Sequence, residues 1–348
     1  MNLTRRKVVK NLTAGAVALP ALSWLNACSG NQQQTEAKET VSEESKAQSL
    51  FFKISLAQWS LHRSFFGAST MEKGWDYFRE TLGSNPDELL QGDLDPMNFP
   101  EIAKNQYGID ALELVNTFYY SKAEDTAYWN AFKEKCQSAG TTCQLIMCDG
   151  LGNLGDSDEA KRMQAVENHY PWVNVAKNLG CHSIRVNAAG EGSADEVKAA
   201  AVDGLGKLSA YGAQNEINII VENHGGYSSD GKWLSDLMSQ VNNPYCGTLP
   251  DFGNFCIERT ADGCANEYDR YVGTQELMPY AKGVSAKTHQ FDAEGNEVNT
   301  DFRKMLTIVK EAGFSGYVGI EYEGKEMSED EGIKATKALL EKVGGTLS

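Results

Sequence analysis

The segment INIIVENHGG, residues Ile217 to Gly226, carries the strongest signal for the fold. Its apolar, β-branched first half is typical of a buried strand. The apolar run ends at Glu222, and Asn223, His224 and two glycines follow directly. Because burying polar groups costs free energy unless they are paired, their place at the end of an apolar strand requires a physical reason.

Short apolar segments of this kind recur along the chain and alternate with helical patterns. The expected strands are residues 52–62, 110–116, 142–150, 181–189, 217–224, 245–254, 283–291 and 316–324. Helical patterns lie between them, and glycine, which ends a helix by adopting positive φ, stands before the next strand at Gly108, Gly140, Gly180 and Gly313.

Strands that alternate with helices pair in parallel and give an α/β fold. Eight such units predict a (β/α)8 TIM barrel, formed by a single domain over residues 51–348. A doubly wound sheet is disfavoured because no glycine-rich phosphate loop follows the first strand. The long connection from residue 63 to residue 96 is expected near the barrel mouth, either as a wall over the site or as an insertion packed on the rim.

Four consecutive expected strands end in a carboxylate or an imidazole, namely Glu222, Asp251, His289 and Glu321. In a barrel these strand ends converge on one mouth. Three carboxylates brought together would raise one another's pKa values, and a divalent cation would remove that penalty. Oxygen ligands with one imidazole suit Mn, Mg, Co or Zn, without a choice among these metals.

The order Glu, Asp, His, Glu, with the motifs ENHGG, DFGN and GIEYEG, resembles the xylose isomerase-like barrels of the sugar phosphate isomerase/epimerase group, over roughly residues 52–345. The resemblance implies that Glu222, Asp251, His289 and Glu321 bind the metal, and that Glu222 and Glu321 act as base and acid. Such a site would stabilise an enediolate and invert a carbon by proton transfer.

Two positions depart from the ketose 3-epimerases of that group. Asn254 stands where those enzymes have a histidine, and Ser228 stands near a substrate-contacting glutamate. Both departures count against simple ketose 3-epimerisation. Despite this departure, Asn254 is predicted to contact the substrate.

Other polar residues near the expected strand ends complete the predicted site. Lys287 shares a strand face with His289 and is predicted to be catalytic, with a salt bridge as the alternative. Glu113, His224 and His62 are predicted to contact substrate, with structural roles as the alternatives.

The leading prediction is therefore a metal-dependent isomerase or epimerase acting on a sugar or keto-sugar. The alternative is a keto-sugar lyase or dehydratase, which would remove the same proton but then expel a β-substituent. An abasic-site endonuclease is disfavoured because the chain has only 5 histidines and a formal charge of −16, which repels nucleic acid. A sugar-binding protein without activity is the fourth possibility.

The N-terminal region predicts export. Arg5 and Arg6 precede a short apolar segment, which resembles a twin-arginine signal over residues 1–27, and LNAC resembles a lipoprotein cleavage box that ends at Cys28. Residues 28–50 are polar and are expected to form a flexible tether. The chain is thus predicted to be periplasmic and to contact a membrane only through a lipid anchor.

The cysteines fit that prediction. Cys256 and Cys264 share one loop-like stretch and could pair in an oxidising compartment. Five others lie in or beside expected strands and helices, where cysteine packs as a small apolar side chain.

Overall fold

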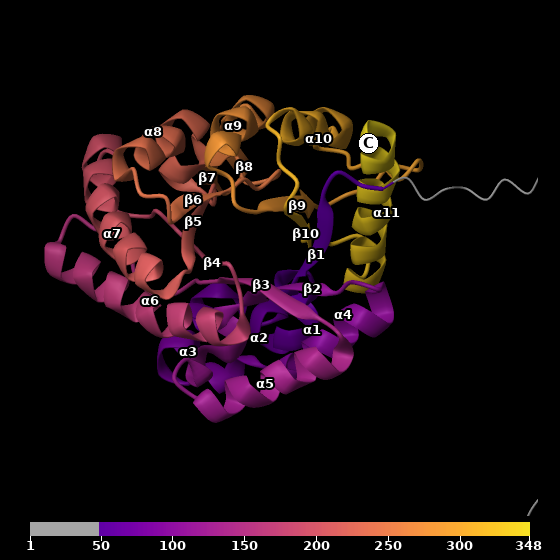
Figure 1. Cartoon of the computed structure of the whole chain (residues 1–348), viewed down its shortest axis with the longest axis horizontal. Coiled ribbons are helices and arrows are strands. Elements are labelled where there is room, and N and C mark those ends of the chain that lie inside the picture. Colours follow the sequence, from indigo (N-terminus) through magenta and orange to yellow (C-terminus); the bar gives the residue numbers. More distant parts are fainter. Residues whose placement is uncertain (1–48) are drawn as a thin grey trace, which may run out of the picture. The chain divides into compact units, whose positions relative to one another are not determined.

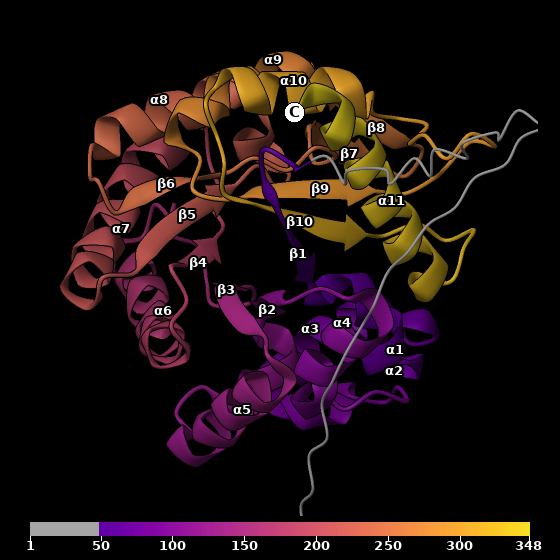
Figure 2. The same cartoon turned by 45° about the vertical axis from the view of Figure 1, so that its right-hand side comes forward.

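The computed structural model describes residues 49–348. The predicted signal peptide, Cys28 and nearly all of the predicted tether lie outside these residues. Eight parallel strands form one sheet in the order β6-β5-β4-β3-β2-β1-β10-β9 (Figures 1 and 2). Their bounds are β1 Lys53–Ala57, β2 Ala111–Val115, β3 Thr142–Met147, β4 Ser183–Val186, β5 Asn218–Glu222, β6 Cys246–Leu249, β9 Val284–Thr288 and β10 Tyr317–Tyr322.

The two outer strands of this sheet, β6 and β9, come together where β6 ends and β9 begins. Parallel bridges join Thr248 to Ala281 and Asp251 to Ser285. The backbone N–H of Phe252 donates to the carbonyl of Ser285 at 3.0 Å. The predicted (β/α)8 barrel is therefore confirmed, and each expected strand contains one strand of the sheet.

Helices follow the strands and cover the outside of the sheet (Figure 1). Their bounds are α1 His62–Phe66, α2 Ala68–Met71, α3 Gly74–Ser84, α4 Phe99–Tyr107, α5 Thr126–Ala139, α6 Glu159–Leu179, α7 Ala194–Asn215, α8 Gly231–Val241, α9 Arg270–Leu277, α10 Phe302–Glu311 and α11 Glu329–Leu347. Gly108, Gly140 and Gly180 end α4, α5 and α6 in the left-handed conformation, as predicted. Among residues 49–348, no helix is long and apolar enough to cross a membrane.

The strands are buried almost throughout and mostly apolar, because helices outside and packed side chains inside shield both faces. In β2, for example, all five residues of the segment ALELV are buried. The charged exceptions lie on the inward face near the strand ends: Glu113, Arg185, Glu222, Asp251, Lys287 and Glu321, each no more than 4% exposed.

The connection after β1 forms α1, α2 and α3 beside the barrel mouth. It packs through aromatic side chains, with Phe66 stacked 4.6 Å from Phe118 and Trp75 lying 6.1 Å from Trp59. Trp75 remains 47% exposed. Part of the connection is thus fixed to the rim, while Trp75 leaves an aromatic surface open.

The structure adds a hairpin that the sequence did not predict, formed by β7 Cys256–Thr260 and β8 Gly263–Glu267. A disulfide joins Cys256 to Cys264, as predicted. The remaining cysteines of the described residues are free and buried, which was also predicted.

Candidate active site

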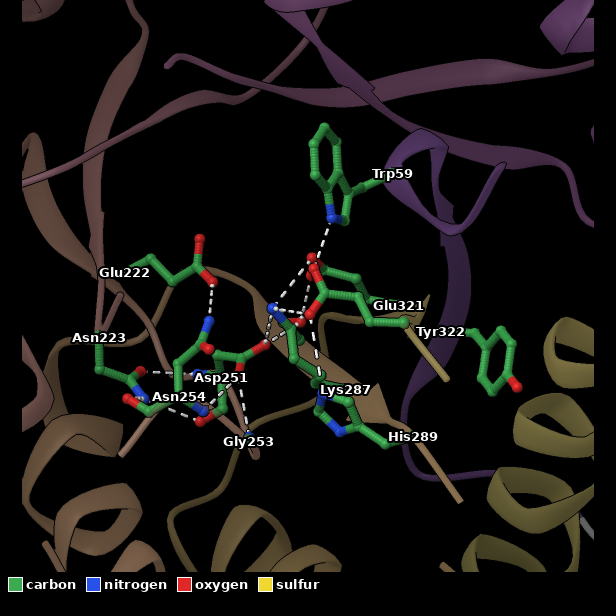
Figure 3. Close-up of polar contacts among 12 residues, drawn as sticks. Trp59, Glu222, Asn223, Asp251, Gly253, Asn254, Lys287, His289, Glu321 and Tyr322 are labelled. Carbon is green, nitrogen blue, oxygen red and sulfur yellow. Dashed lines mark hydrogen bonds and ion pairs between the residues drawn. The ribbon is translucent and has the colours of Figure 1, made fainter. Parts of the chain in front are cut away.

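An acidic cluster lies where the strand ends converge. Glu222 at the end of β5, Asp251 after β6 and Glu321 on β10 each place a carboxylate oxygen within 4.8 Å of the other two (Figure 3). These three buried carboxylates could hold a metal ion. Burial raises the pKa of Glu222 to about 7, an effect that Arg185 opposes and Glu321 reinforces. Burial likewise raises the pKa of Asp251 to about 7, against the influence of Lys287.

Lys287 on β9 brings a positive charge into this cluster. Its Nζ lies 3.2 Å from Glu321 Oε1, 3.9 Å from Asp251 Oδ2 and 3.5 Å from Glu323 Oε2. Burial disfavours the charged amine, but Asp251 and Glu321 hold the pKa of Lys287 well above its usual range. The side chain therefore acts as a fixed cation that gives up its proton with difficulty, and it forms the salt bridges that were the alternative prediction.

Arg185 on β4 is a second buried cation, which the sequence reading missed. Its guanidinium binds Asp149 through two hydrogen bonds of 2.7 and 3.2 Å. Its Nε lies 2.8 Å from Glu222 Oε2, close enough for an ion pair but without hydrogen-bond geometry. An arginine inside an otherwise apolar strand was the available signal, because a buried charge requires a partner.

Asp251 is held by the loop that follows β6. Its Oδ1 accepts hydrogen bonds from the backbone N–H groups of Gly253 at 2.9 Å and Asn254 at 2.8 Å. Asn223 braces the same loop, donating to the carbonyl of Asp251 at 2.9 Å and accepting from its N–H at 2.8 Å. The polar residue after Glu222 thus has a structural purpose.

Asn254 was predicted to contact substrate, and the structure gives it a different partner. Its Nδ2 donates to Glu222 Oε1 at 3.0 Å. Because the other oxygen of Glu222 faces Arg185, Asn254 and Arg185 together fix the orientation of this carboxylate. Asn254 thus positions Glu222, and its contact with substrate stays a prediction.

Ser285 on β9 joins two carboxylates and was also missed. Its Oγ lies 2.6 Å from Asp251 Oδ2 and 2.8 Å from Glu321 Oε2. A hydroxyl has one proton, so it can donate to only one of these oxygens at a time. The second hydrogen bond forms when the facing carboxyl group carries a proton, which agrees with the raised pKa of Asp251.

His289, the fourth predicted metal ligand, does not join the three carboxylates. It follows the last residue of β9, its side chain is 43% exposed, and its Nε2 lies 3.7 Å from Glu323 Oε2. Lys287 faces the carboxylates instead, and an ammonium group has no lone pair with which to bind a metal. The predicted set of three carboxylates and one imidazole is therefore not assembled, and the residues do not fit that metal site.

Glu113 on β2 lies deeper in the barrel. Ser55 Oγ donates to its Oε1 at 2.5 Å, and its Oε2 has no hydrogen-bond partner among the described residues. Burial raises the pKa of Glu113 to about 8, so the side chain is mostly neutral at pH 7. Gly319 makes room for it, since a Cβ atom there would lie 2.5 Å from Glu113 Oε2.

Histidines and a tryptophan line the mouth above the cluster. Trp59 donates its Nε1–H to Glu323 Oε1 at 2.5 Å, and the ring of His62 stacks on it at 4.9 Å. His224 is exposed to solvent. Desolvation by neighbouring protein atoms, reinforced by the charge of Arg185, lowers the pKa of its ring. His62, His224 and Trp59 therefore offer flat ring faces at the barrel mouth.

Comparison with known proteins agrees with this fold. The family model described as Xylose isomerase-like TIM barrel matches residues 102–343. No curated protein matches. A crystal structure of the IolI protein with a zinc atom superposes with a TM-score of 0.61 at 14% identity, covering 85% of this chain and 99% of that chain.

Two solved sugar epimerases are also similar in structure. They are 3-keto-D-glucoside 4-epimerase YcjR from E. coli, with a TM-score of 0.57, 15% identity, and coverage of 70% of this chain and 94% of that chain, and a D-psicose 3-epimerase, with a TM-score of 0.58, 12% identity, and coverage of 73% and 95%. At these identities, the similarity establishes the fold.

Proposed function

The chain belongs to the xylose isomerase-like TIM barrel family, and we propose that it is a sugar isomerase or epimerase that moves a proton beside the carbonyl group of a keto-sugar. The observation that carries this proposal is the buried carboxyl group of Glu222, whose pKa of about 7 suits proton transfer near neutral pH. The solved epimerases of the same fold support the reaction class.

The groups around Glu222 suit the removal of a proton next to a carbonyl. An ionised carboxylate takes the proton, and negative charge develops on the carbonyl oxygen as the enediolate forms. Lys287 and Arg185 supply fixed positive charge at this place, and such preorganised charge lowers the barrier because it needs no rearrangement during the reaction. Glu321, which contacts Lys287 at 3.2 Å, is the second carboxyl group that could return a proton.

The experiment is proton NMR of the purified protein in D2O with a panel of free ketoses and 3-keto-glycosides. Deuterium beside the carbonyl with all substituents retained supports the proposal. Release of a β-substituent would instead identify a lyase, which shares the first step. No exchange in any member of the panel would contradict the proposal. Exchange is also measured in Glu222→Gln. Its matched control is Glu311→Gln, which changes an exposed glutamate at the end of α10.

We further propose that the protein works outside the cytoplasm. The basic start, the box ending at Cys28 and the polar residues after it are the grounds for this proposal. The disulfide between Cys256 and Cys264 supports it, since disulfides persist in oxidising compartments. Mass spectrometry of the N-terminal peptide from the membrane fraction tests this proposal. We expect the peptide to begin at a lipid-modified Cys28, and a protein that still carries residues 1–27 would contradict the proposal.

A further inference from the structure

We propose that the ammonium group of Lys287 takes the place of a resident divalent metal ion in this site. This proposal rests on the proposed function, in which the same site carries out proton transfer. Its physical basis is that buried carboxylates require a nearby positive charge, and this chain supplies that charge from its own sheet.

The first observation is position. Lys287 Nζ lies within 4.0 Å of Asp251, Glu321 and Glu323, and Figure 3 shows the amine between the carboxylates of Asp251 and Glu321. Lys287 and Glu321 are also directly paired in the register of β9 and β10. The register of the sheet therefore places the ammonium group of Lys287 beside the carboxylates.

The second observation is that the side chain of Lys287 is packed in this place. It is only 2% exposed. Its methylene groups lie over Gly253, where an added Cβ would come within 3.1 Å of Lys287 Cγ and Cδ. Gly253, two residues after Asp251, leaves room for the lysine stem, and this packing holds the amine beside the carboxylates.

The third observation is that hydrogen-bonding groups and cations of the protein already face the carboxylate oxygens that a metal would need. Asp251 Oδ1 accepts two backbone N–H groups, and Ser285 Oγ contacts both Asp251 Oδ2 and Glu321 Oε2. Asn254 Nδ2 donates to Glu222 Oε1, and the positive charge of Arg185 faces Oε2 at 2.8 Å without a hydrogen bond. Mg²⁺ demands near-ideal octahedral geometry, and these donors compete with it.

The test measures metal binding without substrate, so that its outcome is separate from that of the turnover experiment. Mn²⁺ is titrated into the full-length wild-type protein and into Lys287→Met, with binding followed by the EPR signal of free Mn²⁺. Lys337→Met, which removes a lysine that donates to the carbonyl of Tyr107, is the control. We expect Lys287→Met to bind one Mn²⁺ at least 10-fold more tightly than the wild type and the control.

A second measurement keeps the inference testable if Lys287→Met does not fold. The melting temperature and the metal content of the wild-type protein are measured before and after EDTA treatment. The inference expects less than one tenth of a bound divalent ion per chain and no shift in melting temperature. One tightly bound ion per wild-type chain, with a melting temperature that EDTA lowers, would overturn it. So would a folded Lys287→Met variant that binds Mn²⁺ no more tightly than the wild type.

Discussion

Arg185→Met tests the electrostatic basis of the site. The guanidinium, 4% exposed, lies 2.7 Å from Asp149 and 2.8 Å from Glu222. Its removal leaves buried carboxylates without their partner, and breaking a buried ion pair from one side costs about 3–5 kcal/mol. At a conversion of about 2 °C per kcal/mol for a large domain, the melting temperature should fall by at least about 6 °C.

The same variant should change the pH dependence of activity. Arg185 lowers the pKa of Glu222 against the larger effect of burial, so its removal should raise that pKa. The pH at which Glu222 becomes ionised, and with it the rise in exchange rate, should then shift upward. Thermal unfolding at pH 7 and the pH–rate profile of proton exchange are the assays.

Arg162→Met is the control for this experiment, because Arg162 pairs with Asp203, whose side chain is 37% exposed. Pairs with exposed partners contribute about 0–1 kcal/mol. A melting temperature for Arg185→Met within about 2 °C of the Arg162→Met value, with an unchanged pH profile, would show that Arg185 does not stabilise the buried carboxylates.

Three further changes address the surroundings of the cluster. Gly319→Ala should lower the free energy of unfolding by about 1–3 kcal/mol, because the new methyl group meets the carboxylate of Glu113, and denaturant unfolding should show recovery when Glu113→Ala is added; no recovery would mean another cause. Glu113→Gln should stabilise the fold at pH 8.5 and have little effect at pH 4. Burial raises the pKa of Glu113 to about 8 in the folded protein, so its neutral form contributes stability at low pH. This contribution is lost as the pH rises from the pKa of the unfolded chain through about 8. Thermal scans across this range check the sign, and equal stability of both proteins at every pH would contradict it. Replacing both Cys256 and Cys264 by serine should cost about 2–3 kcal/mol, and reducing agent should lower the melting temperature of the wild type but not of this variant.

The sequence predicted the barrel because its apolar strands, helix-ending glycines and alternation all indicate the same architecture. It also located Glu222, Asp251 and Glu321, since each lies at the end of an apolar run and parallel strands bring such ends together. The hairpin of β7 and β8 was missed, because its residues are mostly exposed and polar.

The partners within the site were harder to predict. His289 and Lys287 are two residues apart, so both would lie on the same face of an extended strand. Only the structure shows that β9 ends at Thr288, and that the lysine rather than the histidine faces the carboxylates. Arg185 and Ser285 lie inside strands, and their partners come from other strands. A one-dimensional pattern carries no information about such contacts until the register of the sheet is known.

In the proposed reaction, a buried carboxyl group at the barrel mouth moves a proton beside a sugar carbonyl. The most direct test is the rate at which the wild-type protein transfers deuterium from D2O to the carbon next to the carbonyl of a 3-keto-glucoside. We expect exchange that depends on a group with a pKa of about 7, is lost in Glu222→Gln and is retained in Glu311→Gln. Exchange at an unchanged rate in Glu222→Gln would contradict it.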